Sequence, residues 1–437
     1  MRMRWLVGLT LFFILSGGSV LAQEPQETLT LEESIKIALE RNLQLHSAIE
    51  GIAGSEFRRR AAFTDFLPKW TGQYSFSRLN ETPSTTVLGR QIAAGTRDNY
   101  NFNTTINQPL FAGGSIYANY RLEALGVDLS KTDVETVKRN IVLQVREGYF
   151  NILTALKLRD VAEQTVKQFE AQLEVTKAFF EVGIVPKNDL LQAEVRLAQA
   201  RQNLIKAENG VALAKSSFNT LLRREINTPL SVVDILEYKP SAPRFEECLE
   251  EALRLRPEIK GAELNIGQAK EGVKIARSGF FPTVGLSGVY SRFGDEPLVQ
   301  GSKSKDPWSW TLGWLATWTF GDWGKVAYKV VESKVKVTQA EDSKVQLVEG
   351  ITLEVKQDYL NMLQAEKNIG VAEKAIEQAE ENLRMNEERY KYQVATATDV
   401  LDAVTLLAQA RVNYYGALSD FNVAKARLER AMGRMYP

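Results

Sequence analysis

Residues 308–320 read WSWTLGWLATWTF and contain four of the seven tryptophans in the chain. The apolar residues at alternate positions are Trp308, Trp310, Leu312, Trp314, Ala316, Trp318 and Phe320. Serine, threonine and glycine fill most of the positions between them. Because successive side chains of a strand point to opposite faces, this pattern predicts a strand with one aromatic face and one small, polar face. A strand that lies between lipid and a water-filled lumen has this pattern.

Three further segments show the same alternation more weakly: 70–80, 98–110 and 283–293. Trp70, Tyr74 and Phe76 would share one face of the first segment, and Tyr100 and Phe102 one face of the second. Strands of this length span a bilayer when they are tilted. The alternative is a soluble sandwich whose aromatic faces pack on each other. The residues that we expect to contact lipid are Trp308, Trp310, Trp314, Trp318, Trp70, Tyr74, Phe76, Tyr100 and Phe102.

The composition argues against several functions. Basic and acidic residues both number 54, so the chain as a whole has no field that would attract nucleic acid. A single histidine, His46, and a single cysteine, Cys248, leave little for a metal site. The chain also lacks the G-x-S-x-G and H-E-x-x-H patterns of common hydrolases. We therefore expect no enzymatic activity, no metal, no cofactor and no nucleic-acid partner.

The N-terminus has the pattern of an export signal. Arg2 and Arg4 precede an apolar run at 5–15, and small residues follow up to Ala22. This predicts a secretory signal peptide at residues 1–22. A membrane anchor is the alternative, but the apolar run is shorter than the ~20 residues that a spanning helix needs.

The rest of the sequence consists of two similar halves. Residues 31–78 resemble residues 245–292, and NDLLQAEVRLAQAR at 188–201 resembles TDVLDAVTLLAQAR at 398–411. A period near 210 residues is too long for a solenoid repeat and indicates a duplicated half-molecule. We predict a first repeat at 23–222, a connector at 223–243 and a second repeat at 244–437.

Each half has the same predicted order of elements. A helix (31–66 or 245–280) ends before a proline, two strands follow, and a very long helix comes next (113–181 or 325–392). A short turn then leads to a return helix, at 188–221 or 398–432. At ~1.5 Å per residue the long helix measures on the order of 100 Å, which no compact domain contains. The first and return helices together equal its length, so we expect them to stack end to end beside it.

The return helices carry a seam with a 3.5-residue period, which is typical of a coiled coil. In the first half it runs through Leu190, Ala193, Leu197, Ala200, Leu204, Ala207, Val211, Ala214, Phe218 and Leu221. In the second half it runs through Val400, Ala403, Leu407, Ala410, Tyr414, Ala417, Phe421, Ala424, Leu428 and Ala431. Large residues alternate mostly with alanine, which allows close antiparallel packing.

Four strands cannot close a barrel, and an open sheet edge in lipid leaves backbone groups unpaired at several kcal/mol each. Several chains must therefore share one barrel. A homotrimer would supply twelve strands, and the same axis would gather twelve helical columns into a hollow cylinder. The expected fold class is mainly α with a small β part, in which long antiparallel coiled-coil helices form an α-barrel and four strands per chain join a shared 12-stranded transmembrane β-barrel.

The chain resembles the outer-membrane efflux proteins, the TolC-like channel-tunnels. The resemblance rests on LEESIKIAL and FEECLEEAL, on FLP and FFP before the strands, on QPLFAGG before the long helix, and on VGIVPKNDLLQAE and VATATDVLDAV at the hairpin turns. It implies the passive exit duct of a three-part efflux or type I secretion machine in the outer membrane of a Gram-negative bacterium, extending into the periplasm. The implied partners are a periplasmic adaptor, an inner-membrane pump of the RND or ABC type, and outer-membrane lipid.

The resemblance also implies a gate at the hairpin turns, 182–188 and 392–398. Asp399 and Asp402 match two aspartates that ring the constriction, Asp189 matches a first-half aspartate, and Tyr390 matches a tyrosine that holds the gate shut. The second-half glycine and the arginine expected just after it are replaced by Gln393 and Ala395. Rings of carboxylates would favour cations and repel anions. The alternative is that Asp189 and Asp399 are first-turn acids that interact with a helix dipole.

A soluble periplasmic coiled-coil adaptor is the competing function. It would also have a signal peptide and long hairpins. It would not need a tryptophan-rich strand face.

Overall fold

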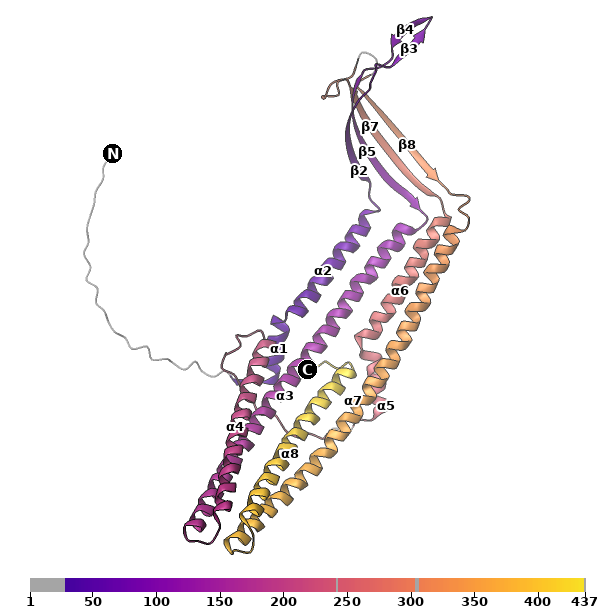
Figure 1. Ribbon diagram of the computed structural model, residues 1–437. Helices are drawn as coiled ribbons and strands as arrows, with labels where there is room; N and C mark the ends of the chain where they lie inside the picture. Colours follow the sequence, from indigo (N-terminus) through magenta and orange to yellow (C-terminus); the bar gives the residue numbers. More distant parts are fainter. Residues whose placement is uncertain (1–27, 241–242, 303–305, 436–437) are drawn as a thin grey trace, which may run out of the picture.

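The computed structural model describes residues 28–240, 243–302 and 306–435 (Figure 1). The signal peptide expected at residues 1–22 lies outside the described residues. Two helices of 67 residues each dominate the fold, α3 (Ser115–Glu181) and α7 (Lys325–Lys391). Each is followed by a return helix of 35 residues, α4 (Lys187–Leu221) or α8 (Ala397–Ala431). The predicted order of long and return helices is thus confirmed.

The first helix of each half is broken in two, which corrects the single helices expected at 31–66 and 245–280. The observed segments are α1 (Leu31–Arg41), α2 (Leu43–Thr64), α5 (Phe245–Leu255) and α6 (Pro257–Arg277), followed by a short 3-10 turn η1 (Ser278–Phe280). The residue at each break, Asn42 or Arg256, is extended, with φ near −70° and ψ near 124°.

The two breaks have different causes. The Asn42 side chain accepts hydrogen bonds from the backbone N–H groups of Gln44 and Leu45 at 2.8 and 3.1 Å, and so caps α2. Arg256 precedes Pro257, whose ring disfavours a helical conformation in the residue before it and suits the first position of a new helix.

The four predicted strands form one antiparallel sheet. They are β2 (Lys69–Arg78), β5 (Asp98–Ala112), β7 (Thr283–Gly294) and β8 (Trp308–Thr317), in that spatial order. The strand predicted at 308–320 ends three residues early, because Trp318 leaves the ladder and its indole N–H donates to the carbonyl of Phe280 at 3.1 Å. The strand predicted at 70–80 likewise ends at Arg78, and β5 continues to Ala112.

Two short ribbons escaped the sequence analysis. One is a parallel pair, β1 (Thr28–Leu29) with β6 (Ser231–Val232). The other is a hairpin, β3 (Ser84–Val87) with β4 (Arg90–Ala93), inserted between β2 and β5. In Figure 1 this hairpin projects beyond the end of the main sheet that is far from the helices.

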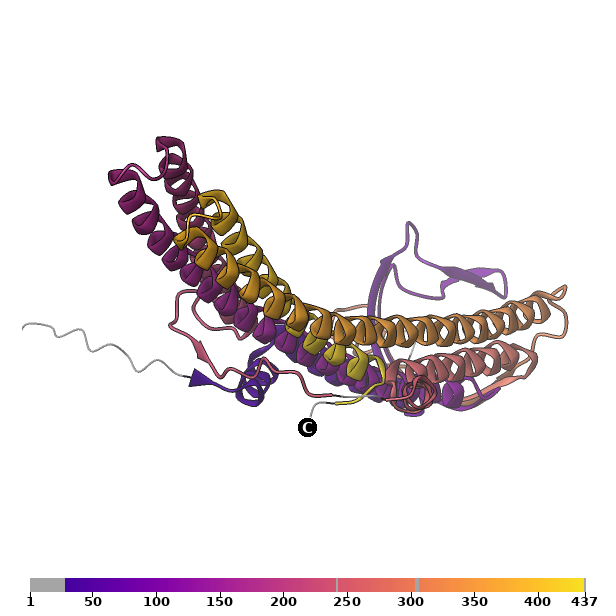
Figure 2. The same cartoon turned by 90° about the horizontal axis from the view of Figure 1, so that it is seen from below.

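The helices form a single curved layer of four columns. α2 packs against the part of α3 nearer the sheet, and α4 packs against the part nearer the hairpin tips. α6 and α8 each pack against both α3 and α7 (Figure 1). The end-to-end stacking inferred from the helix lengths is therefore confirmed. Figure 2 shows that the layer is curved, with β1, β6 and the segment 223–240 on its convex side and the β3–β4 hairpin on its concave side. Among the described residues, no helix has both the length and the apolar character that crossing a membrane would require.

The coiled-coil seam is confirmed by burial. In α8 the seam residues other than Tyr414 are buried against α7 and its neighbours, and in α4 the buried residues include Ala193, Leu197, Ala200 and Phe218. The larger of the two apolar clusters lies at the middle of the layer and includes seam residues of both return helices. There Tyr149 of α3 is fully buried, and its hydroxyl donates to the carbonyls of Leu29 and Val233 at 3.1 and 2.8 Å. This contact joins the β1–β6 ribbon to the long helix.

Candidate functional site: the hairpin tips and the sheet

The two hairpin turns have the same backbone shape although their sequences differ. Two residues after the end of each long helix there is a residue with positive φ, Gly183 (80°) or Gln393 (58°). The N–H of the next residue, Ile184 or Val394, reaches back at 2.8 Å to a carbonyl in the last helical turn. This is the hydrogen bond of a Schellman cap. Replacement of the expected second-half glycine by Gln393 therefore leaves the shape of the turn unchanged.

Tyr390, near the end of α7, connects the second hairpin to the first. It is only 3% exposed, and its hydroxyl donates to the hydroxyl of Thr176 on α3 at 3.3 Å. Its ring centroid lies 5.4 Å from that of Phe179. Burial raises the pKa of Tyr390, and the negative charge of Asp189 on α4 adds to the rise. Asp189 itself lies in the first turn of α4, at the same tip.

The carboxylate of Asp402 on α8 forms an ion pair with Arg196 on α4 at 3.0 Å. One helical turn closer to the tip, the Thr398 hydroxyl donates to the side-chain oxygen of Gln192 at 2.9 Å. Both contacts join residues that are 206 apart in the sequence, so α4 and α8 meet near the tip with a constant stagger. These contacts link the two hairpins of one chain.

Sequence reasoning missed Arg196 and Gln192. The repeat relates Asp402 to Gln192, because the two return helices align with an offset of 210 residues. The spatial stagger of 206 residues differs from that offset by one helical turn, so the partner of Asp402 is Arg196 instead. No pattern within either helix carries this information.

Asp399 has a local role. It forms a capping box with Thr396, whose backbone N–H donates to the Asp399 carboxylate at 2.8 Å, while the Asp399 N–H donates to the Thr396 hydroxyl at 3.2 Å. The hydrogen bond from the Thr396 backbone holds the pKa of Asp399 below its usual value, so this carboxylate is charged at neutral pH. Asp399 and Asp402 are both exposed on one chain, and Ala395 packs against the apolar core of the tip.

The sheet places the predicted aromatics on one face. In the pairing register Tyr74 lies opposite Phe102, Phe102 opposite Arg292, and Arg292 opposite Trp308. The same face carries Trp70, Phe76, Tyr100, Trp310 and Trp314. Trp70 and Trp314 are 77% and 73% exposed, and Tyr100 and Phe102 are half-buried. The opposite face carries Asn99, Asn101, Asn103, Asn107 and neighbouring serines and threonines.

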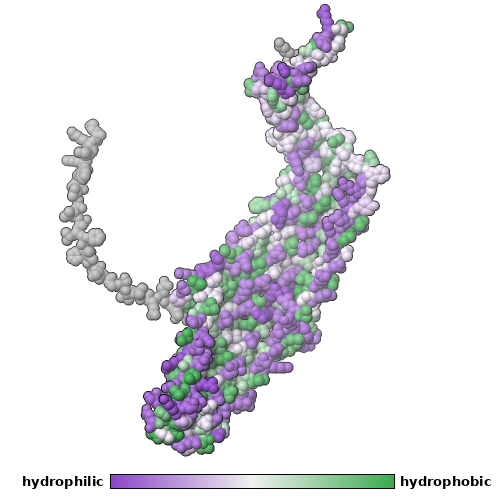
Figure 3. Space-filling view, in the orientation of Figure 1, coloured by the Kyte–Doolittle hydropathy of each residue, from purple (hydrophilic) through white to green (hydrophobic). Residues whose placement is uncertain are grey.

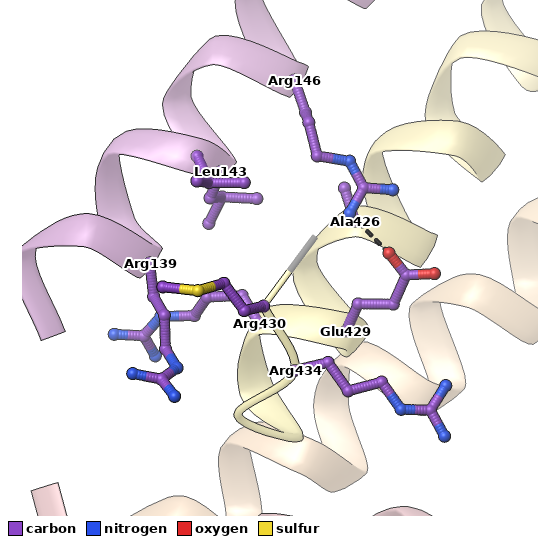
Figure 4. Close-up of a pocket in the computed structure, with 9 residues that line it drawn as sticks. Arg139, Leu143, Arg146, Ala426, Glu429, Arg430 and Arg434 are labelled. Carbon is purple, nitrogen blue, oxygen red and sulfur yellow. Dashed lines mark hydrogen bonds and ion pairs between the residues drawn. The ribbon is translucent and has the colours of Figure 1, made fainter. Parts of the chain in front are cut away.

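A cavity of about 270 Å³ lies between α3 and the end of α8, lined by Arg139, Arg146, Arg430, Arg434 and Glu429 among others (Figure 4). Figure 4 shows Arg146 and Glu429 joined by an ion pair. Arg434 binds Glu251 of α5 at 2.7 Å, and Arg430 binds Glu354 of α7 at 2.6 Å. Because carboxylates already neutralise these guanidinium groups, we interpret the cluster as a structural junction that ties the two repeats together at mid-height.

Comparison with known proteins identifies the family. The model of the outer membrane efflux protein family matches residues 34–222 and 248–434. Outer membrane efflux protein BepC of Brucella suis biovar 1 is 22% identical over 424 residues, which cover 97% of this chain and 89% of BepC. Alkaline protease secretion protein AprF of Pseudomonas aeruginosa is 26% identical over 297 residues, which cover 65% of this chain and 58% of AprF.

Among solved structures, the fold of CusC is similar to that of this chain. The two superpose with a TM-score of 0.79 at 18% identity, over 93% of this chain and 92% of CusC. The fold of this chain therefore has a counterpart of known structure.

Proposed function

The chain belongs to the outer membrane efflux protein family, and from this premise we propose that three copies assemble into one passive channel that carries cargo from the periplasm to the exterior. As a member of this family the chain is an outer-membrane exit channel and not an enzyme. The number of copies, the gate and the partners are the parts that we propose here.

The open sheet is the main observation that supports the proposed trimer. β2 and β8 each have a neighbour on one side only, so both edges of the four-stranded sheet present unpaired backbone groups. A membrane-facing sheet with free edges is strongly disfavoured, because lipid offers no hydrogen-bond partner. Joining β8 of one copy to β2 of the next removes every edge. Three copies give twelve strands, which leave room for a lumen lined by the asparagine-rich face.

The helical layer has two edges whose exposed apolar residues lie at similar distances from the tip. The α4 edge exposes Leu191 and Ile205, and the α7 edge exposes Met385 and Val371. Ile205 lies 18 residues after the start of α4, and Val371 lies 20 residues before the end of α7. At ~1.5 Å per residue these positions are roughly 27 and 30 Å from the tip. Packing α4 against α7 of the next copy would cover both sets.

The two edges also expose apolar residues at the end of the layer that adjoins the sheet. Phe63 on α2 and Tyr328 on α7 are exposed within one turn of the sheet-side ends of their helices. Apolar side chains, green in Figure 3, are spread among polar ones over the helical body. Such large exposed apolar residues on two opposite edges are typical of an interface.

The tips offer a surface for a partner. Val182 and Ile184 in the first turn, and Tyr392 and Val394 in the second, are exposed at matching positions of the two repeats. We propose that a periplasmic adaptor covers them and connects the channel to an inner-membrane pump of the RND or ABC type. The names of BepC and AprF indicate efflux and protease secretion for those relatives, and both cargo classes apply as proposals here.

The test combines mass, membrane association and current. Purified full-length protein should have the mass of a trimer in detergent, should resist extraction from membranes by carbonate, and should form conducting pores in planar bilayers. A carbonate-extractable monomer without pore activity would favour the soluble adaptor function. A deletion strain tested against drugs, dyes and secreted proteases would then separate the two cargo classes.

A further inference from the structure

The hairpin β3–β4 is placed where it could close the outer mouth of the channel. It leaves the sheet between β2 and β5, on the side away from the helices, and projects beyond the sheet (Figure 1). Figure 2 shows it on the concave side of the helical layer. In a closed ring of subunits the concave side faces the axis. The hairpin therefore extends over the lumen rather than into the surrounding lipid.

The turn of this hairpin contains Leu88 in a backbone conformation that is unfavourable for leucine. Val87 pairs with Arg90, so Leu88 and Gly89 alone form the loop, with φ of 50° and 78°. This is the two-residue turn with both central residues at positive φ, for which asparagine followed by glycine is the preferred sequence. A leucine in this conformation costs roughly 1–2 kcal/mol relative to an ordinary one. Leu88 is also 100% exposed on a single chain.

One face of the hairpin combines two apolar residues, Val87 and Ile92, with Thr85 and Arg90. The register places Val87, Arg90 and Ile92 on the same face, because Val87 pairs with Arg90 and Thr85 pairs with Ile92. Val87 and Ile92 are about half exposed. The opposite face carries Thr86 and Gln91.

We propose that the three β3–β4 hairpins of the trimer meet over the pore axis and form an outer constriction, with the Leu88 tips packed on one another and three Arg90 side chains around them. This inference depends on the proposed trimer. A 12-stranded barrel with strands 4.8 Å apart and tilted by ~40° has a radius of roughly 12 Å. The four residues of β3 alone span roughly 13 Å, so the hairpin is long enough to reach the axis.

Contact between copies accounts for both unfavourable features of Leu88. Packing three leucines together removes their apolar surface from water, which offsets the strain of positive φ. Arg90 makes no ion pair with the described residues of its own chain, so the ring would keep its positive charge. Such a ring favours anions over cations at the outer mouth, opposite to an aspartate ring at the periplasmic tip.

Cysteine cross-linking tests the contact. The background is the full-length Cys248→Ser protein, since Ser34 fills the matching buried position in the first repeat. In this background, where each subunit has one thiol, we expect Leu88→Cys and Val87→Cys to be linked into covalent dimers by a short bifunctional maleimide in outer membranes. Thr86→Cys, which lies beside Val87 but on the opposite face, is the control and should be linked far less.

The mass of the same preparations distinguishes failure of the hairpin constriction from failure of the trimer on which it depends. A trimer whose Leu88→Cys and Val87→Cys variants are not linked above the Thr86→Cys level would overturn the hairpin constriction and leave the trimeric channel standing. A monomer would overturn both. For the charge ring, Arg90→Gln should shift the reversal potential in a salt gradient toward cation selectivity. An unchanged reversal potential would contradict the proposed ring of Arg90 side chains.

Discussion

Arg196 on α4 and Asp402 on α8 form an ion pair of 3.0 Å that joins the two hairpins of one chain at the tip. The arginine that the family resemblance implies is replaced by Ala395, which packs against the apolar core of the tip. We propose that the Arg196–Asp402 pair and the Tyr390–Thr176 hydrogen bond together hold the hairpins in the closed arrangement.

Replacing Arg196 should loosen the tip. An exposed ion pair contributes about 0.2–1 kcal/mol, so Arg196→Ala should raise the open population of each subunit's tip roughly 1.4- to 5-fold. The measurement is mean current and opening frequency in planar bilayers. Arg201→Ala is a matched control, because Arg201 binds Glu170 at 2.8 Å and thereby joins α4 to α3 within one hairpin. Equal effects of the two variants would contradict a lock between the hairpins.

The aspartates should act through their charge. Asp399→Asn removes the charge but keeps an oxygen that can accept the hydrogen bond from the Thr396 N–H, whereas Asp399→Ala also removes the cap. Block by a trivalent cation should weaken in Asp399→Asn and Asp402→Asn to a similar degree. If block weakens only in Asp399→Ala, the effect comes from the lost helix cap and the carboxylate ring is ruled out.

Alkaline pH should destabilise the fold through Tyr149. Burial raises the pKa of Tyr149 from 10.0 to about 12, so the folded state favours the neutral phenol. Its contribution is fully present below pH 10, the unfolded value, and is lost as pH rises toward about 12. The lost contribution amounts to about 2–3 kcal/mol.

The matched variant for this prediction is Tyr149→Phe. It should be less stable by about 1 kcal/mol at neutral pH, because it lacks the hydrogen bonds to Leu29 and Val233. It should also lose less stability between pH 10 and 12 than the parent protein. Parallel melting curves of the two proteins over this range, followed by circular dichroism, would refute the assignment.

Opposite faces of β8 should respond differently to charge. Trp314→Lys places an ammonium on the face that we propose contacts lipid, at about 2–4 kcal/mol near the bilayer centre. Leu315→Lys, one residue along the strand and on the other face, should be far better tolerated in a wet lumen. The readout is the fraction of protein recovered as folded oligomer in outer membranes. A reversed order would mean that the sheet faces are assigned the wrong way round.

Much of the fold follows from local patterns. The alternation of tryptophans predicted β8 and its aromatic face, and the 3.5-residue seam predicted which side of α8 is buried. The helix breaks at Asn42 and Arg256 were missed, although both signals were present: a capping asparagine and a proline one residue later. The hairpin β3–β4 was missed because its strands have four residues each, too few for a periodic pattern to emerge.

The sequence by itself determined the duplicated plan, the lengths of the helices and the polarity of each strand face, because these depend on periodicity within single segments. Only the tertiary structure decided which side chains meet at the tip. Asp402 pairs with Arg196 rather than with its repeat-related neighbours because α4 and α8 lie one helical turn out of step. That stagger results from the packing of α4 against α3 and of α8 against both α3 and α7, and no single segment of the chain encodes it.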